Sequence, residues 1–430
     1  MAKPNLALIP AAQGTKLYSV LPSDGSGDFD FTRGSTTNPD ATRINAQGLI
    51  ETVPNTSSRL NYPLLDGKVV GCPHHILEPQ RTNLVQYSEE FNNSYWLKAL
   101  TSVTANQVIS PDGSQTADML IKNADYGSLY KTGISATSGS NYTFSVFVKK
   151  GTTDFLSLRQ ASGSNDVRKQ FDLNTGAVTN GLAGNQTGFV SSNFEEYSNG
   201  WYRLSITCTS NGTSITISIY SGKVGESTFN GNSYIWGAML EQGSYPTSYI
   251  KSNSGSATTR LAETADNSGS AATFNDSEGC LMAEISALAD DNTFRNICIS
   301  DGSTSDKIQF YYRPDVNQIT MLITAASSTQ AAKTVTLSSS LEFNKILIKY
   351  KQNNFQLWIN GFELGTDTSG ITPIGLSELA FDDGVGGNDF YGKTKQIQYF
   401  DTALSDTQLE ELTSWDSFSD MANGQLYTIE

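Results

Sequence analysis

The chain has 430 residues, enough for two or three domains, and only 17% of them are charged. Abundant Gly, Ser, Thr and Asn, with 19 Tyr and 20 Phe, indicate short strands, many turns and buried rings rather than long helices. The net charge of −15 makes nucleic acid and acidic membrane surfaces poor partners, and no apolar run approaches the length of a membrane span. We therefore expect an all-β protein without membrane insertion.

Residues 1–83 form a lead segment rich in Gly, Pro and Asn, with little sustained periodicity. Lys16–Leu21 and Asp28–Arg33 alternate as short strands, and Asn45–Gly48 predicts a hairpin loop with Gly at a positive φ. Because so few periodic apolar residues cannot build a core, we expect an extended anchoring segment on another surface, either of the later domains or of a partner protein. Its first residues make a poor signal peptide, so synthesis in a cytoplasm is expected.

Residues 84–250 show strand patterns spaced by about ten residues and separated by Gly, Asn and Ser turns such as Asn174–Gly176. This spacing is typical of an antiparallel β-sandwich or jelly roll. Apolar and polar residues alternate, so one face of each strand is predicted to be buried. The expected strands are Tyr142–Lys149, Phe155–Arg159, Lys169–Leu173, Trp201–Thr209, Ser214–Tyr220 and Tyr234–Leu240.

Residues 251–261 are small and polar and are predicted to be a linker, and residues 262–415 predict a second antiparallel sandwich. Asn360-Gly361 is the strongest two-residue hairpin signal in the chain. The expected strands are Gly279–Ile285, Phe294–Ser300, Lys307–Arg313, Gln318–Thr324, Lys333–Leu337, Lys345–Lys351, Phe355–Ile359 and Lys393–Phe400.

One helix is predicted near the C-terminal end of the second sandwich. Ser405 is an N-cap, and Gln408 at the third helical position completes a capping box. Residues 416–430 look like a tail that needs a partner to be ordered. Leu404 and Leu409 form the hydrophobic staple of the predicted helix, and its apolar stripe consists of Leu409, Leu412 and Trp415.

Three strings resemble bacteriophage structural proteins that form tail or head fibres with lectin-like domains. Residues 24–51 resemble their N-terminal motif, and residues 76–96 resemble the motif at the entrance to their first domain. Residues 233–250 resemble the last strand of that domain and the segment leading out of it. The patterns at 343–364 and 390–415 look like a concanavalin A-like or laminin-G-like sandwich.

The resemblance implies a virion structural protein, a fibre or fibre-adaptor subunit on a tail or capsid, made in the host cytoplasm and located in the virion. It implies a carbohydrate-binding-module-like jelly roll followed by a laminin-G-like domain, which is the better candidate for contact with host-surface glycans. Because fibre proteins bury their anchors against copies of themselves, we expect a homotrimer or another symmetric assembly, with other virion proteins as partners. A purely architectural capsid decoration protein is the alternative.

An enzyme, a tail-borne glycan depolymerase, is the competing class. Glycan hydrolysis needs two carboxylates on opposite sides of a sugar. The nearest acidic pairs are adjacent residues, whose side chains diverge on a strand or a helix. We therefore expect no catalytic residues, no enzyme activity and no cofactor. The acidic pairs are Glu195-Glu196, Asp290-Asp291 and Glu410-Glu411.

Neither the histidines nor the cysteines predict a metal site. His74 and His75 are the only histidines and adjoin Cys72, but a fourth ligand and a defined spacing are missing. Cys280 and Cys298 could form a disulfide, although free buried thiols are the favoured interpretation.

Three tryptophans are candidate platforms on which a sugar ring could stack. Trp201 follows a turn at the start of a strand and is the candidate for an exposed carbohydrate-binding residue. Trp236 and Trp358 lie within alternating strands and are expected in the core.

The stretch 381–392 gathers oxygen-bearing side chains around flexible glycines. Asp382, Asp383, Asn388 and Asp389 could hold Ca²⁺. Turn chemistry alone also explains these residues, so a polar loop at the rim of the sandwich is favoured and no metal is predicted.

The stretch Ile76–Trp96, at the entrance to the first globular domain, carries no chemistry and is expected to be structural. Arg81 could pair with Glu78 as a clamp, and Trp96 closes the stretch in an aromatic cluster. We expect Arg81→Ala or Trp96→Ala to impair folding or incorporation into particles.

Overall fold

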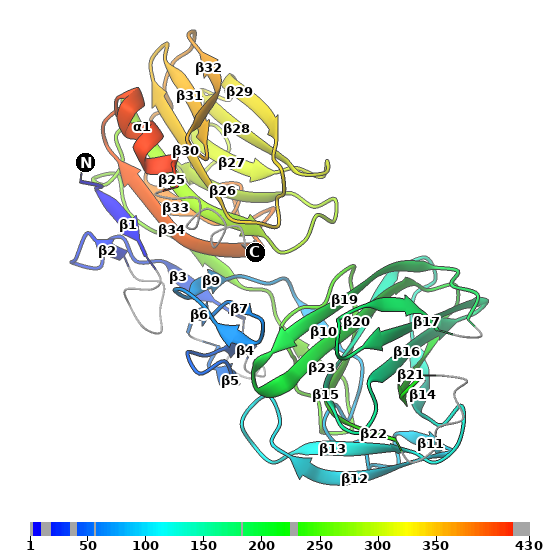
Figure 1. The fold of residues 1–430 in the computed structure, drawn as a ribbon. Helices are drawn as coiled ribbons and strands as arrows, with labels where there is room; N and C mark the ends of the chain where they lie inside the picture. Colours follow the sequence, from blue (N-terminus) through cyan, green and yellow to red (C-terminus); the bar gives the residue numbers. More distant parts are fainter. Residues whose placement is uncertain are drawn as a thin grey trace.

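The computed structural model describes residues 3–9, 19–34, 41–55, 57–181, 184–223 and 231–415. Strands form almost all of the regular structure in these residues, which confirms the predicted all-β fold of sandwich-like domains. Two antiparallel sandwiches lie apart in the molecule, and strands of the lead segment lie between them (Figure 1).

In the described part of residues 84–250, two six-stranded antiparallel sheets pack face to face. Alternating apolar residues from both sheets, such as Phe144, Leu204 and Ile217, are fully buried in one core. In hydrogen-bonded order, the first sheet contains β11 (Leu97–Ala99), β14 (Ser128–Ser135), β21 (Ser214–Ser221), β16 (Phe155–Ser162), β17 (Asn165–Asp172) and β18 (Val178–Asn180). The second contains β12 (Thr101–Val108), β13 (Ala117–Lys122), β22 (Asn232–Gln242), β15 (Asn141–Lys150), β20 (Trp201–Thr209) and β19 (Phe189–Tyr197).

The described residues after 262 form a second sandwich with a core of its own. Leu281, Ile297 and Ile348 are fully buried in it. Its larger sheet contains β25 (Glu278–Ala287), β30 (Asn344–Lys351), β31 (Phe355–Ile359), β32 (Phe362–Asp367) and β34 (Gly392–Phe400). The opposite sheet contains β29 (Ser328–Thr336), β28 (Gln318–Ala325), β27 (Lys307–Tyr312), β26 (Arg295–Ser300) and β33 (Glu378–Ala380).

The lead segment is built into both sandwiches, so its described residues lie on later domains of the same chain. Leu6 in β1 pairs with Tyr399 in β34, and Leu6 and Leu8 are buried in the second core. On the other side, Ile50 packs in a buried cluster with Phe147 of the first sandwich. The strands of the segment are β1 (Leu6–Leu8), β2 (Ser19–Leu21), β3 (Asp30–Thr32), β4 (Ala41–Ile44), β5 (Ile50–Val53), β6 (Arg59–Asn61), β7 (Leu64–Leu65), β8 (Lys68–Val69), β9 (His74–Ile76) and β10 (Arg81–Asn83).

Two hairpins predicted from glycine-containing turns are present. Asn45–Gly48 lies between β4 and β5, and Gly48 has a φ of 77°. Asn360 and Gly361 join β31 to β32 with φ values of 50° and 88°. A type I′ turn needs a positive φ at both positions, which Asn and Gly adopt most readily.

The predicted helix is present as α1 (Asp406–Thr413). The Ser405 N–H donates to Gln408 Oε1 at 3.0 Å, as expected for the capping box. Within the described ranges, no helix is long and apolar enough to cross a membrane. The predicted tail 416–430 and residues 16–18 of the first predicted strand lie outside the described residues. Three of the apolar residues predicted for the helix are buried against the second sandwich: Leu404, Leu409 and Leu412.

Trp96→Ala is expected to cost about 3–5 kcal/mol of unfolding free energy. The indole is 1% exposed, its ring centroid lies 5.2 Å from that of Phe91, and its Nε1–H donates to the Tyr87 carbonyl at 2.8 Å. Urea unfolding of the variant measures the loss. Trp96→Phe keeps most of the buried ring and should cost clearly less, and equal losses for both variants would contradict this account.

Candidate functional site at the junction of the two sandwiches

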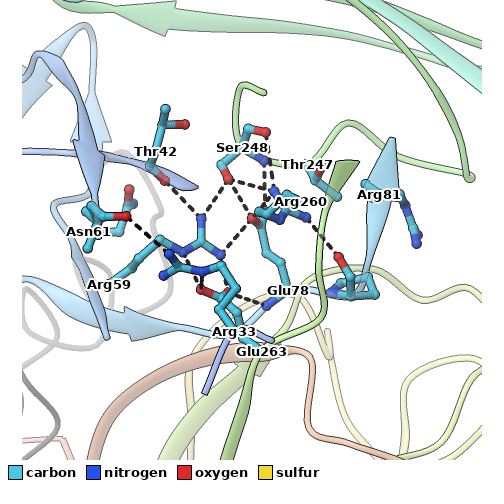
Figure 2. Close-up of polar contacts among 12 residues, drawn as sticks. Arg33, Thr42, Arg59, Asn61, Glu78, Arg81, Thr247, Ser248, Arg260 and Glu263 are labelled. Carbon is cyan, nitrogen blue, oxygen red and sulfur yellow. Dashed lines mark hydrogen bonds and ion pairs between the residues drawn. The ribbon is translucent and has the colours of Figure 1, made fainter. Parts of the chain in front are cut away.

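Five charged side chains meet where the lead segment approaches the residues that join the two sandwiches (Figure 2). This junction network consists of Arg33, Arg59, Glu78, Arg260 and Glu263, and none of these side chains is more than 3% exposed. Glu263 Oε1 accepts hydrogen bonds from Arg33 Nε and Arg59 Nε, both at 2.8 Å. Its other carboxylate oxygen receives a second hydrogen bond from Arg59.

Glu78 is the second carboxylate of the junction network. Its Oε2 lies 2.8 Å from Arg59 Nη2 and 2.7 Å from Arg260 Nη1. Ser248 donates its backbone N–H to Glu78 Oε1 at 2.8 Å and its hydroxyl to Oε2 at 2.5 Å. The two carboxylates are also linked, because the Glu78 N–H donates to Glu263 Oε2 at 2.9 Å. Every buried charge of the network therefore has an opposite charge and further hydrogen bonds, as burial requires.

The guanidinium groups also hold irregular backbone in place. Arg33 donates to the carbonyl oxygens of Val53 and Ser57, each at 3.1 Å. Arg260 donates to the Pro79 carbonyl at 2.9 Å. Because a guanidinium carries five N–H donors in a rigid fork, it can bind a carboxylate and several carbonyl groups at once.

Electrostatics favour the ionised forms of Glu78, Glu263 and Arg59 in the junction network. Burial alone would raise the pKa of Glu78, but Arg260 and Arg59 outweigh burial and hold it well below its usual value. The pKa of Glu263 is lowered in the same way, because Arg59 and Arg33 outweigh the effect of burial. Burial would likewise lower the pKa of Arg59, yet Glu263 and Glu78 raise it.

Two members of the network and one of its hydrogen-bond donors lie in the strings 24–51, 76–96 and 233–250. Arg33 belongs to the string 24–51, Glu78 to 76–96, and Ser248 to 233–250. Their charged side chains follow no strand or helix period, so sequence reasoning from periodicity missed the network. The resemblance strings are the signal that could have pointed to it.

The predicted pairing of Arg81 with Glu78 is wrong. Both carboxylate oxygens of Glu78 are already bound by other groups of the network. Arg81 lies apart from them in Figure 2, with its Nε 3.6 Å from Glu241 Oε2 and its guanidinium over the Tyr245 ring at 5.5 Å.

Residues 251–261, expected to be a linker, are anchored in the described structure. The strand β23 (Thr258–Arg260) pairs with β10, so that Arg81 faces Arg260. Arg260 has no exposed surface, because it belongs to the junction network. The connection between the sandwiches is therefore held by backbone pairing and by buried ion pairs.

His74 and His75 are buried in β9, at 2% and 0% exposure. Burial lowers the pKa of His75 to about 4, so its imidazole is neutral at neutral pH. Among the residues that the structure describes, neither ring nitrogen of His75 has a hydrogen-bond partner. Among the described residues, no three His, Cys, Asp or Glu side chains are grouped so that they could hold a metal ion.

The tryptophans considered for sugar stacking are all buried. Trp201 is 1% exposed and its Nε1–H donates to the Ile109 carbonyl at 3.1 Å, so the exposure expected for it is wrong. Residues of the lead segment and of β22 cover its ring, since Trp201 shares a cluster with Ile50 and Trp236. Trp236 and Trp358 are 1% and 7% exposed.

The carboxylates of the oxygen-rich loop 381–392 accept hydrogen bonds from backbone and side-chain groups of the same loop. Asp382 accepts the N–H groups of Gly384 and Gly386 at 2.6 and 2.9 Å. Asp383 accepts the Asn388 side-chain amide at 2.9 Å. Asp389 accepts the Tyr391 hydroxyl at 2.7 Å. These contacts are the local turn chemistry expected of a polar loop at the rim of the sandwich.

Cys280 and Cys298, which could have formed a disulfide, are both buried free thiols. Burial raises the pKa of Cys280 to about 12, so its thiol is not ionised at neutral pH. Cys72 is exposed and also free.

Beside the junction network lies a junction cavity of about 440 Å³, lined by the lead segment and by both sandwiches. Aromatic rings form part of its wall: the Phe147 and Tyr197 ring centroids are 4.9 Å apart, and those of His74 and Phe343 are 5.6 Å apart. Polar side chains line the remainder. The cavity thus has the size and the mixed lining of a small-ligand pocket. Its polar lining includes Asn61, Asp66, Glu78, Glu195, Glu196 and Lys393.

No protein-family model matches the sequence, and no curated protein matches it. A solved carbohydrate-binding module of family 40, from the Ruminococcus gnavus IT-sialidase bound to α2,3 sialyllactose, shares 14% identity with a TM-score of 0.29, covering 34% of this chain and 92% of that chain. A heptameric SAP-like pentraxin from Limulus polyphemus shares 13% sequence identity at a TM-score of 0.26, and the match covers 33% of this chain and 71% of that chain. Sheep galectin-11 shares 10% sequence identity at a TM-score of 0.21, and the match covers 29% of this chain and 90% of that chain. Each match concerns about a third of this chain and carries no functional assignment.

Proposed function

We propose that this protein is a bacteriophage virion structural protein, a fibre or fibre-adaptor subunit that binds host-surface glycans without cleaving them. The virion part of the proposal is supported by the strings 24–51, 76–96 and 233–250, which resemble phage fibre proteins. Arg33 and Glu78 of the junction network belong to two of these strings, and Ser248 of the third donates to Glu78, so the resemblance coincides with the part of the fold that joins the domains.

The observation that carries glycan binding is the junction cavity. Its aromatic rings suit the carbon-bound faces of a sugar, and its carboxylate, amide and amine groups suit hydroxyl and acidic substituents. The cavity lies between two β-sandwiches that share the lead segment. A ligand there contacts both sandwiches at once.

The lead segment supports a role in display. Its strand β1 extends the sheet of the second sandwich, and its residue Ile50 packs on the first. An attachment made through this segment would therefore hold both sandwiches in one orientation. Copies of the same chain, in a homotrimer or another symmetric assembly, and other virion proteins are the partners that we propose.

Binding assays on the purified full chain test the glycan part of the proposal. We expect saturable binding on a glycan array and to whole host cells, and none with heat-unfolded protein. Absence of binding in both assays would favour an architectural decoration protein. Release of oligosaccharide from host capsule or lipopolysaccharide would instead make the protein a depolymerase.

Antibody labelling of intact particles tests the virion part. We expect the label at tail fibres or at the capsid surface in electron micrographs. Particles without label, together with protein found only in the host cell, would contradict a virion role.

A further inference from the structure

Three residues that line the junction cavity, Lys393, His74 and Arg203, carry nitrogen atoms without a hydrogen-bond partner among the described residues, and Lys393 and His74 carry the argument here. Lys393 in β34 lines the cavity and is half-buried, and in the described part of the chain no hydrogen bond or ion pair reaches its Nζ. His74 also lines the cavity and is 2% exposed, and its Nδ1 has no hydrogen-bond partner among the described residues. An unsatisfied buried polar group costs about 1–3 kcal/mol, so His74 Nδ1 points to an acceptor supplied by a ligand, and the half-buried Lys393 can donate to the same acceptor.

The surroundings of His74 make its Nδ1 a donor. Burial lowers the pKa of His74 well below 6.5, so the ring is neutral and carries one proton. The ring Nε2 lies 3.5 Å from the side-chain amide nitrogen of Asn61, which can only donate. Nε2 is therefore the acceptor, and Nδ1 carries the proton.

Other lining groups provide the opposite chemistry. The carboxylates of Asp66, Glu195 and Glu196 line the cavity and can accept hydrogen bonds from hydroxyl groups. Glu195 Oε1 already accepts the Asn193 amide at 3.0 Å, which positions this carboxylate. The Tyr197 ring, packed edge-on against its aromatic neighbour, supplies an apolar surface.

We propose that the junction cavity binds a sugar residue that carries a carboxylate, with Lys393 and His74 donating to the carboxylate and Asp66 and the glutamates accepting from the hydroxyl groups. This rests on the glycan-binding function proposed above and names the class of sugar. A neutral sugar offers Lys393 no anion, whereas a uronic acid satisfies both nitrogen groups. The volume of about 440 Å³ falls within the range of small-ligand pockets.

Two sugars that differ only in the carboxylate test the proposal directly. Calorimetric titration of the full chain with methyl β-glucuronide should give a dissociation constant at least about tenfold lower than with methyl β-glucoside. Equal affinities for the two sugars, or no detectable binding of the glucuronide, would overturn the proposal.

Lys393→Met, which keeps most of the aliphatic length of the side chain but removes the amine, should weaken glucuronide binding at least about tenfold. It should also leave the unfolding midpoint unchanged or raise it, because it removes an unpaired, half-buried ammonium. The matched control is Lys351→Met, since Lys351 pairs with Glu278 at 2.7 Å and its side chain is 53% exposed. The control should bind both sugars like the parent chain.

The outcomes separate this proposal from the proposed function. Glycan-array binding together with unaltered glucuronide binding by Lys393→Met would place the sugar elsewhere and overturn only the cavity assignment. Absence of binding to every glycan on the array and to both methyl glycosides would overturn the cavity assignment and the glycan-binding function together.

Discussion

Glu263→Gln is expected to lower the free energy of unfolding by about 3–5 kcal/mol at neutral pH. The Glu263 side chain has no exposed surface and accepts hydrogen bonds from Arg33 and Arg59. Gln has nearly the same size but no charge. The variant therefore leaves three buried guanidinium groups with one carboxylate, that of Glu78. Urea unfolding followed by circular dichroism measures the loss.

Glu51→Gln provides the matched control for this substitution. Glu51 also pairs with an arginine, Arg43, but the two side chains are 35% and 16% exposed. An ion pair of this kind contributes less than about 1 kcal/mol, so the control should unfold almost like the parent chain. Similar losses for both variants would show that the buried network does not hold the junction together.

A double variant tests whether the network acts as a unit. Arg33→Met removes one of the two guanidinium groups that donate hydrogen bonds to Glu263 Oε1. Combined with Glu263→Gln, it should lower the free energy of unfolding by less than the sum of the two single losses. Glu263→Gln leaves the buried Arg33 without its carboxylate partner, and Arg33→Met removes that unpaired charge. Additive losses would contradict this coupling.

The strands with the strongest alternation were predictable from the sequence. The predicted strands Trp201–Thr209 and Phe355–Ile359 match β20 and β31 at both ends. Two of the strands that were missed, Thr101–Val108 and Phe189–Tyr197, lie at sheet edges, are rich in polar residues and have few buried positions. An edge strand with little buried surface shows no apolar period, so the pattern carries no signal for it.

Strand partners far apart in the sequence could not be predicted. Leu6 and Leu8 form only a short apolar patch, and nothing local indicates that they pair with Tyr399 and Ile397 of β34. This pairing places the lead segment on the second sandwich. It is decided by the buried surface that the finished sheet offers, which no sequence window contains.

The candidate site was the least predictable part of the molecule. A turn before Trp201 suggested an exposed ring, but Ile50, more than a hundred residues away in the lead segment, helps to bury it. Lys393 sits in an alternating strand, where a lysine normally faces solvent. Only the meeting of the lead segment with both sandwiches turns that outward-facing position into the wall of a cavity.

His75→Leu is expected to gain stability relative to the parent chain as the pH falls from 6.5 toward 4. The pKa of His75 is lowered by burial from 6.5 to about 4, so the unfolded chain binds a proton in this window that the folded chain does not. The stability that depends on neutral His75 is complete above pH 6.5 and is lost as the pH falls toward about 4. The difference in unfolding free energy between the parent chain and the variant should change by about 1.4 kcal/mol per pH unit in this window.

The difference in unfolding free energy between the parent chain and His75→Leu isolates the titration of His75. Asp266 acts in the opposite direction, because burial raises its pKa from 3.8 to about 6 and its contribution is lost as the pH rises through that value. Glu78 and Glu263, with lowered pKa values, add a loss only below about pH 4.5. These contributions are common to parent and variant and cancel in the difference of unfolding free energies. Ile76→Leu in the same strand should shift stability by an amount independent of pH, and the same flat difference for His75→Leu would show that His75 is not held neutral in the folded protein.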